Sequence, residues 1–130
     1  MEKGREFSLS RLIVIVDDDS AVRHSLKFSL EVEGFAVCAF SAAADLLNAP
    51  DLPDCACLVI DQNMPGMSGL DLVARLRDRR VSVPAILITS HPSAVVSTRA
   101  AHAGVAIVEK PFLGTTLIDS IRAAVLQQPA

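Results

Sequence analysis

The sequence has no tryptophan, no tyrosine and no long hydrophobic run, and these absences limit the kind of core and the class of protein. Apolar residues make up 51% of the 130 residues with five phenylalanines as the aromatics, so the core must be aliphatic. No apolar run approaches the roughly 20 residues of a membrane-spanning helix. The charged start MEKGREFSLS is not followed by the apolar stretch of a signal peptide. We therefore expect a soluble, cytoplasmic domain without a membrane partner.

Cysteine and clustered basic charge are also scarce. The three cysteines, Cys38, Cys55 and Cys57, are an odd number in a small domain, which argues against a disulfide framework. We expect all three to be buried apolar residues, with Cys55 and Cys57 pointing the same way on one strand. Net charge is -3, and lysine and arginine are spread along the chain. Direct binding to nucleic acid is therefore not indicated.

Short apolar runs and helix-like segments alternate five times along the chain. Runs rich in β-branched residues predict strands at 11–16, 35–40, 55–60, 84–89 and 105–109. Such alternation predicts an α/β fold, with a parallel sheet covered by helices on both faces. We expect one domain over residues 11–127, between an N-terminal tail at 1–10 and a tail or linker start at 128–130.

Helix signals lie between these runs. Three serines are predicted N-caps: Ser20, Ser41 and Ser68. Two glycines are predicted helix stops: Gly34 and Gly104. The helix after Ser68 is expected to place Leu70, Val73 and Ala74 on one face. The last two helices are predicted at about 93–102 and 113–127.

Polar residues collect where the predicted strands end, which is where ligands bind in this fold class. They are Asp17, Asp18, Asp19, Asp61, Thr89, Ser90, Glu109 and Lys110. Two carboxylates about 4 Å apart repel by roughly 4 kcal/mol at an effective dielectric near 20, so a positive partner is needed. Mg²⁺ suits oxygen ligands, with Mn²⁺ as an alternative. Lys110 adds a fixed positive charge and Thr89 a hydroxyl.

Carboxylate, cation, lysine and hydroxyl together predict a cradle for a phosphoryl group, in which one carboxylate is the nucleophile. The residues alone leave open which carboxylate attacks. Each residue also has an ordinary structural interpretation: Asp17 to Asp19 as helix caps, Asp61 as a turn residue, Lys110 as a solvated charge. Their joint placement at one edge of one predicted sheet favours a site.

Four motifs give the chain a family resemblance. VDDD follows the first strand, DQNMPGMSG the third, ITS the fourth and EKPF the fifth. From about Leu12 to Val125 the chain resembles the receiver domain of two-component response regulators, most closely receivers of the nitrogen-fixation regulator type. The resemblance implies a flavodoxin-like (βα)5 fold with sheet order 2-1-3-4-5, and a phosphoacceptor signalling domain rather than an enzyme.

The resemblance also implies a role for each matching residue. Asp61 would accept a phosphoryl group from a sensor histidine kinase or a phosphotransfer protein. Asp17, Asp18, Asp61 and the backbone carbonyl of Asn63 would bind Mg²⁺, with Asp18 more direct than Asp17. Thr89 would move toward the phosphoryl oxygens and Lys110 would pair with them.

Three further positions concern regulation. Asn63 and His91 fall where the family tunes the lifetime of the phosphoaspartate. The switch would couple Thr89 to the residue three before the lysine, which is usually Phe or Tyr in the family and is Ile107 here. We expect activation to reshape the face formed by the helix at about 93–102, the strand at 105–109 and the last helix. That face would control an output domain or partner, and homodimerisation through it is a family expectation.

Two alternatives remain open. In a haloacid-dehalogenase-type phosphatase, Asp17 would be the nucleophile and Asp19 the general acid, assisted by Thr89 or Ser90 and by Lys110. That interpretation leaves the Asp61 loop unexplained and lacks a further acidic motif, since Asp119 alone follows the lysine, within a predicted helix. In a degenerate receiver the domain would only bind partners, and Ile107 is the feature that favours this.

Overall fold

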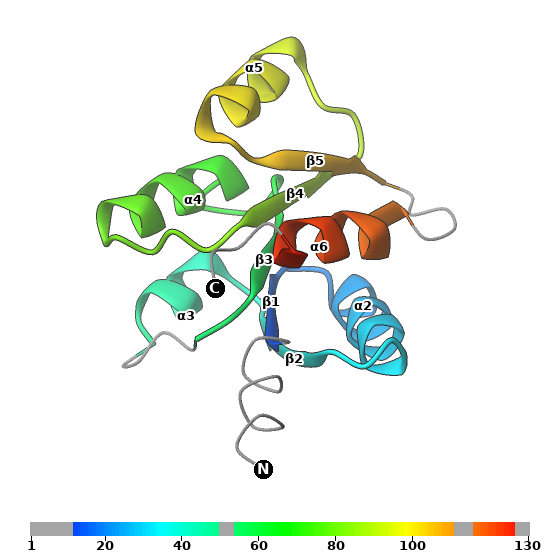
Figure 1. The fold of residues 1–130 in the computed structure, drawn as a ribbon. Helices are drawn as coiled ribbons and strands as arrows, with labels where there is room; N and C mark the ends of the chain where they lie inside the picture. The colour runs from blue at the N-terminus through cyan, green and yellow to red at the C-terminus, as the bar shows by residue number, and fades with distance from the viewer. Residues whose placement is uncertain (1–11, 50–53, 111–115, 127–130) are drawn as a thin grey trace.

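The structure is a computed structural model that describes residues 12–49, 54–110 and 116–126 of the chain. The predicted tails at 1–10 and 128–130 lie outside these residues. Within the described part, strands and helices alternate as predicted (Figure 1).

The centre of the fold is a parallel sheet of five strands. They are β1 (Leu12–Val16), β2 (Ala36–Phe40), β3 (Cys57–Asp61), β4 (Ala85–Thr89) and β5 (Ala106–Glu109). Their order is β2-β1-β3-β4-β5, which confirms the predicted fold class and sheet order. β2, β4 and β5 start one residue later than predicted and β3 two residues later, whereas the predicted first residue of β1, Arg11, lies outside the described residues. In the register, Ile15 of β1 lies between Ala39 of β2 and Val59 of β3.

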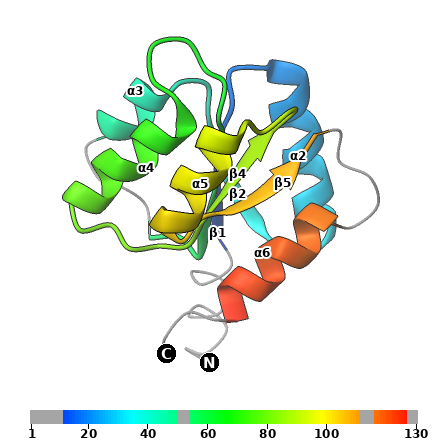
Figure 2. The ribbon, with the colours of Figure 1, turned by 90° about the horizontal axis from the view of Figure 1, so that it is seen from above.

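Five helices in the described residues cover the two faces of the sheet. They are α2 (Ser20–Val32), α3 (Ala43–Leu47), α4 (Gly69–Asp78), α5 (Ala94–Ala103) and α6 (Thr116–Leu126). Figures 1 and 2 show α2 and α6 on one side of the sheet and α3, α4 and α5 on the other. β1, β3 and β4 are buried on both faces, as expected for strands covered by helices on both sides.

Two aliphatic clusters fill the space between the sheet and these layers. Leu30 and Ile121 pack from α2 and α6 against Ile13 of β1 in one cluster. Leu46 and Leu76 pack from α3 and α4 on the opposite face in the other. Alternate residues of each strand point into opposite clusters, so the apolar strand sequences need no polar face.

The helix starts differ from the prediction at two places. Asp19, not Ser20, caps α2, because its Oδ1 accepts hydrogen bonds from Ala21 N and Val22 N. Ser41 does not cap α3, whose N-cap residue is Ala42 without a side-chain hydrogen bond. Asp19 has the extended backbone of an N-cap residue, and Ser20 is already the first residue of α2. In the second case the extended residue before the helix is Ala42, so Ser41 lies one position too early.

The other capping predictions are confirmed. Ser68 caps α4 by accepting from Asp71 N at 3.1 Å. Gly104 ends α5 in the left-handed conformation, with φ at 70°. Gly34 follows the last residues of α2, with φ at 96°.

Two predictions about burial are corrected. Leu70, Val73 and Ala74 do share one face of α4, as predicted, but Ala74 is exposed, and Leu72 and Leu76 complete the buried part of the helix. Cys57 is buried in the cluster under α2 and α6, whereas Cys38 and Cys55 are only partly buried and pack on the opposite cluster. Cys55 precedes β3, so the alternation of a strand does not apply to it. All three thiols are free, and burial raises the pKa of Cys57 to about 12.

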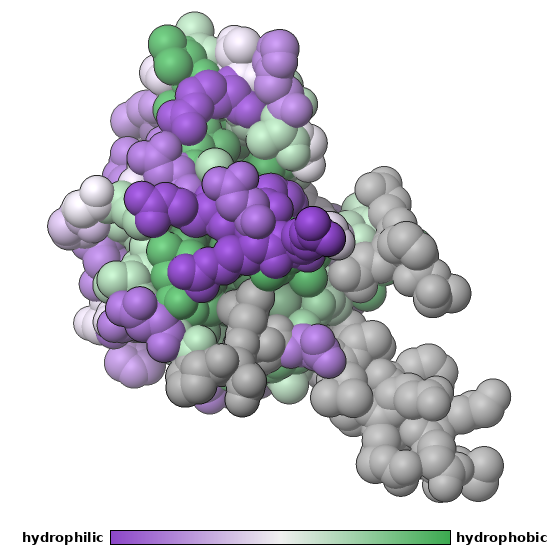
Figure 3. Space-filling model, turned by 90° about the vertical axis from the view of Figure 1, so that its left-hand side faces the viewer, coloured by the Kyte–Doolittle hydropathy of each residue, from purple (hydrophilic) through white to green (hydrophobic). Residues whose placement is uncertain are grey.

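The outer surface on the α4 side is strongly polar. Figure 3, which views this side, shows hydrophilic residues as a broad purple band with smaller green hydrophobic areas between them. Arg75, Arg79 and Arg80 are exposed, and Arg99 of α5 pairs with Asp71 of α4 at 3.2 Å. No helix in the described ranges is long and apolar enough to cross a bilayer.

Candidate functional site

The carboxyl ends of four strands bring the candidate side chains to one edge of the sheet. Asp17 follows β1, Asp61 ends β3, Thr89 ends β4 and Lys110 follows β5. Because the strands are parallel, all these ends lie on the same edge. The hydrogen bond from Lys110 N to Thr89 O, at 2.8 Å, carries the pairing of β4 and β5 up to the lysine.

Three carboxylates meet in this pocket. Each of Asp17, Asp18 and Asp61 offers an oxygen, and these oxygens all lie within 4.8 Å of one another. Asp17 and Asp61 are buried, with 0% and 3% of their surface exposed, and Asp18 is exposed. Burial raises the pKa of Asp61, and the neighbouring Asp17 carboxylate raises it further. The Asn63 N–H and the Lys110 ammonium oppose these effects on the pKa.

Lys110 bridges the two buried carboxylates. Its Nζ lies 3.4 Å from Asp61 Oδ1 and 3.6 Å from Asp17 Oδ2. Asp17 Oδ2 is nevertheless a buried oxygen without a hydrogen bond, since the ion pair is too long for one. The single ammonium group of Lys110 therefore does not compensate the charge of both carboxylates or pair all of their oxygens. An unpaired buried carboxylate oxygen among converging oxygen donors fits a hard divalent cation.

Asn63 connects Asp61 to Thr89. Its backbone N–H donates to Asp61 Oδ1 at 3.2 Å, and its side-chain Nδ2 donates to Thr89 Oγ1, also at 3.2 Å. Sequence reasoning did not find the second bond. No sequence signal could have revealed it, because the two residues are 26 positions apart and their approach depends on the packing of β3 beside β4.

The Asp61 loop is anchored to the start of α4. A Cβ atom on Gly69 would lie 2.6 Å from the Asp61 carbonyl oxygen and 2.7 Å from Leu87 Cδ1, so only glycine fits there. The buried Gln62 side chain accepts from Leu70 N at 2.9 Å. Gln62 was also missed by sequence reasoning, because its bond joins residues eight positions apart across the loop.

The turn after β1 is held in a similar way. Asp19 N donates to Asp17 Oδ1 at 2.9 Å, and Arg23 Nη1 donates to the Asp17 carbonyl at 2.8 Å. Arg23 therefore fixes the backbone of the acidic turn, a role that sequence reasoning missed. The sequence signal for this role is an arginine in the first turn of the helix that follows the acidic run, from where its side chain can reach back to Asp17.

Other candidates lie outside this cluster. Asp19 uses its carboxylate to cap α2, and Ser90 and His91 are exposed beyond β4. In the part of the chain that the structure describes, no hydrogen bond or ion pair joins His91 to the carboxylates. Ile107 lies within β5, partly buried against the cluster under α3, α4 and α5. The engagement of Asp19 Oδ1 as a helix cap counts against Asp19 as the general acid of the phosphatase alternative.

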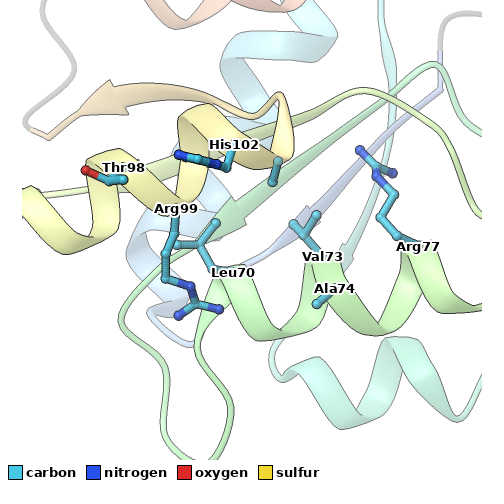
Figure 4. Close-up of a pocket in the computed structure, with 8 residues that line it drawn as sticks. Leu70, Val73, Ala74, Arg77, Thr98, Arg99 and His102 are labelled. Atoms are coloured by element: carbon cyan, nitrogen blue, oxygen red, sulfur yellow. The ribbon is translucent and has the colours of Figure 1, made fainter.

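A hollow between α4 and α5 is separate from the carboxylates (Figure 4). Its volume is about 390 Å³ and it is lined by Leu70, Val73, Ala74, Arg77, Thr98, Arg99, His102 and Ala103. The Arg77 guanidinium is engaged with the carbonyls of Val81 and Val83, at 2.7 and 2.8 Å. With no carboxylate in its lining, this hollow does not offer the ligands of the strand-end pocket.

Comparison with known proteins agrees with this geometry. The sequence model of the response regulator receiver domain matches residues 13–122. The chain belongs to the response regulator receiver family. The transcriptional regulatory protein FixJ of Rhizobium meliloti is 44% identical over 112 residues, which are 85% of this chain and 54% of FixJ. The response regulator protein TodT of Pseudomonas putida is 37% identical over 119 residues, 91% of this chain and 52% of TodT.

Solved structures share the fold of this receiver domain. The crystal structure of FixJ-N superimposes with a TM-score of 0.81 and 39% identity, covering 93% of this chain and 98% of that one. A CheY-like receiver domain from Methanospirillum hungatei superimposes with a TM-score of 0.83 and is 28% identical in sequence. The match covers 91% of this chain and 95% of that one. The receiver domain spans about half the length of the curated relatives it matches.

Proposed function

We propose that this receiver domain accepts a phosphoryl group on Asp61 from the phosphohistidine of a sensor histidine kinase or phosphotransfer protein. One observation carries the proposal. Lys110 lies between two buried carboxylates, one of which keeps an unpaired oxygen, so the pocket holds more negative charge than its lysine compensates. Such a pocket is suited to a cation and a phosphoryl group together.

In the transfer, an Asp61 carboxylate oxygen attacks phosphorus, the phosphorus–nitrogen bond of the phosphohistidine breaks, and its electron pair returns to the imidazole. The product is an acyl phosphate on Asp61. Asp61 must be ionised to attack, and the Lys110 ammonium at 3.4 Å favours the ionised form against the raised pKa of the buried carboxyl group. In the acyl phosphate, Lys110 pairs with a phosphoryl oxygen.

The acidic pocket would hold Mg²⁺, with Mn²⁺ as the alternative for the same donors. Asp17, Asp18 and Asp61 provide carboxylates, and the backbone carbonyl of Asn63 is the proposed fourth protein ligand. When bound, the cation supplies positive charge to the phosphoryl oxygens. Other residues of the chain hold these ligands in place. The Arg23 side chain and the Asp19 N–H fix Asp17, and Gly69 allows α4 to approach the Asp61 backbone.

The readout is proposed to pass through Thr89 to the face formed by α5, β5 and α6. Ile107 is smaller than the usual ring and stiff at its first torsion, so the coupling differs from ring rotation. Amide shifts measured with and without an acyl-phosphate mimic test this step. We expect changes in α5 and β5 as well as around Asp61; changes confined to the Asp61 pocket would contradict it.

The biological setting is proposed from the family. The domain would act in the cytoplasm as a phosphoacceptor, with only self-phosphorylation and autodephosphorylation as chemistry, and without binding nucleic acid or membrane directly. Its face of α5, β5 and α6 would control an output domain or partner, with homodimerisation through it as an option. The receiver is proposed to span 11–127, with 1–10 as a tail, 128–130 as a tail or linker start, and Asn63 and His91 tuning the phosphoryl lifetime.

Incubation with acetyl phosphate or phosphoramidate and Mg²⁺, followed by intact mass measurement, tests the proposal. We expect a gain of one phosphoryl group in the wild type and none in Asp61→Asn. Incorporation that survives in Asp61→Asn would favour the phosphatase alternative with Asp17 as nucleophile. Failure of the wild type to gain mass would leave the binding-module alternative ahead.

A further inference from the structure

The position of the Thr89 hydroxyl is set by a residue of the phosphoacceptor loop. Thr89 is 2% exposed, and its Oγ1 accepts a hydrogen bond from Asn63 Nδ2 at 3.2 Å. The backbone N–H of the same asparagine donates to Asp61 Oδ1 at 3.2 Å. Asn63 therefore contacts both the proposed phosphoacceptor and the proposed switch hydroxyl.

The backbone of Thr89 is held in place on two sides. It is paired with Glu109 of β5, and its carbonyl accepts from Lys110 N at 2.8 Å. On the other side, the preceding Ile88 is in register with Asp61 of β3. A change at Thr89 is therefore easiest as a rotation of its side chain, which would carry Oγ1 away from Asn63 Nδ2. The hydroxyl has one hydrogen to donate and two lone pairs with which to accept, so the bond from Asn63 leaves its donor free; what the bond holds is the position of Oγ1.

We infer that the Asn63 side-chain amide is a resting-state latch on Thr89, which holds Oγ1 in its present position until the proposed movement of the threonine toward a phosphoryl oxygen breaks the bond. The inference rests on the proposed function, because it assigns a regulatory part to the same site. In the resting structure no hydrogen bond joins Thr89 to Asp61 within the described residues. The proposed movement of Thr89 toward a phosphoryl group on Asp61 therefore starts from its bond to Asn63.

The latch matters more with Ile107 than it would with the Phe or Tyr that the family usually has at this position. An isoleucine has no planar ring whose rotation could favour one position of the threonine, and its first torsion is restricted. Ile107 lies in register with Leu87, two residues before Thr89, and packs into the cluster under α3, α4 and α5. The contact between Asn63 and Thr89 is thus the described interaction that acts directly on the switch hydroxyl.

The expected effect follows from the strength of a single hydrogen bond. Removing the amide donor raises the free energy of the resting state but not that of the state in which the hydroxyl faces Asp61. Because a typical hydrogen bond changes an equilibrium by roughly 3- to 10-fold, the switched state should become more populated by about that factor. The Asn63 carbonyl, the proposed cation ligand, is a backbone group and is kept in every variant.

The test is a double-mutant cycle with near-isosteric changes. Asn63→Leu removes the donor and Thr89→Val removes the acceptor. Apparent dissociation constants for beryllofluoride with Mg²⁺ are measured by fluorine NMR, since the chain lacks tryptophan for intrinsic fluorescence. Amide spectra without beryllofluoride report the position of the resting equilibrium, and urea unfolding shows that each variant is folded.

We expect Asn63→Leu to bind beryllofluoride about 3- to 10-fold more tightly and to shift its resting spectrum toward the bound one. In the Thr89→Val background, the same change should have no effect on the affinity. Unchanged affinity in Asn63→Leu, or an equal gain in both backgrounds, would overturn the latch alone. Failure of the wild type to bind beryllofluoride would overturn the proposed function, and the latch with it.

Discussion

Lys110 holds its ammonium nitrogen 3.4 Å from Asp61 Oδ1, although the two residues are 49 positions apart in the chain. The same nitrogen lies 3.6 Å from Asp17 Oδ2. One positive charge therefore faces two buried negative ones. Breaking such a pair leaves an uncompensated charge in a poorly solvated place, which is the costly event, whereas forming it gains little.

Replacing Lys110 by Met is expected to lower the free energy of unfolding by about 1–3 kcal/mol at neutral pH without divalent cations. The lower part of this range applies, because the lysine side chain is 22% exposed and solvent screens the pair. Urea unfolding followed by circular dichroism measures the change. Lys110→Arg, which keeps the charge, should recover part of the loss.

Lys27 provides the matched control. Its pair with Glu31 is an exposed contact within α2, with both side chains 46% exposed. Lys27→Met should change stability by less than about 0.5 kcal/mol. A loss in Lys110→Met no greater than in this control would show that the strand-end lysine does not compensate the buried carboxylates.

We expect the free energy of unfolding to depend on pH through the titration of Asp61. Burial and the Asp17 carboxylate raise its pKa in the folded chain above the ordinary 3.8. The folded state therefore binds this proton more tightly than the unfolded state, and stability falls as pH rises from the unfolded pKa through the folded one. Below the unfolded pKa the penalty is absent.

Asp61→Asn removes this titration and leaves the other groups in place. Without divalent cations, the variant should gain stability relative to the wild type as pH rises from about 4 to 7.5. Paired urea titrations across this range measure the difference. Added Mg²⁺ should narrow or reverse the difference in unfolding free energy between the two proteins at pH 7.5, because the wild type binds the cation better than the variant does. A difference that stays constant with pH would contradict the raised pKa.

The sheet and the strand-end site could be predicted from the sequence because both depend on local signals. A buried parallel strand needs a short β-branched run such as RLIVIV, and parallel strands bring their ends to one edge whatever the details. The sequence alone therefore predicts that Asp17, Asp61, Thr89 and Lys110 lie together.

What could not be predicted depends on distances between segments remote in the chain. The bond between Asn63 and Thr89 and the contact of Gly69 with the Asp61 carbonyl depend on how closely β3, β4 and α4 pack. Asp19 replaced Ser20 as the cap because two adjacent residue types can both cap, and only the backbone angles decide. Cys55 was misplaced because the strand began two residues later than the apolar run.

Gly69 is expected to be intolerant of even one added methyl group. In Gly69→Ala, the new Cβ would lie 2.6 Å from the Asp61 carbonyl oxygen, so α4 and the phosphoacceptor loop must separate. We expect a loss of roughly 1–3 kcal/mol in the free energy of unfolding, as for other overpacked positions. Amide shifts should concentrate at Asp61, Gln62 and Leu70.

Gly66 offers a control in the same loop. It has φ at 84°, but a Cβ there would meet no atom within 4 Å. Asparagine tolerates this conformation, so Gly66→Asn should lose less than about 1 kcal/mol. Equal losses at both positions would mean that loop conformation, not the close approach of α4 to Asp61, makes Gly69 necessary.

Variants of Asp19 test whether its carboxylate caps α2 or takes part in the pocket formed by the neighbouring aspartates. Its carboxylate accepts from Ala21 N and Val22 N at 2.9 and 3.3 Å, so it serves the start of α2 and not the pocket. Asp19→Ala should lower stability by about 1 kcal/mol, whereas Asp19→Asn should retain most of it, because asparagine caps helices as well as aspartate does.

The same pair of variants separates the receiver from the phosphatase alternative. A general acid cannot be replaced by an amide, so a phosphatase would lose turnover in Asp19→Asn while remaining folded. For the receiver, Asp19→Asn should incorporate phosphate from phosphoramidate at the wild-type rate, measured as the intact mass over time with Mg²⁺ present. A large fall in that rate with unchanged stability would place Asp19 in the chemistry of the pocket and contradict its role as a helix cap.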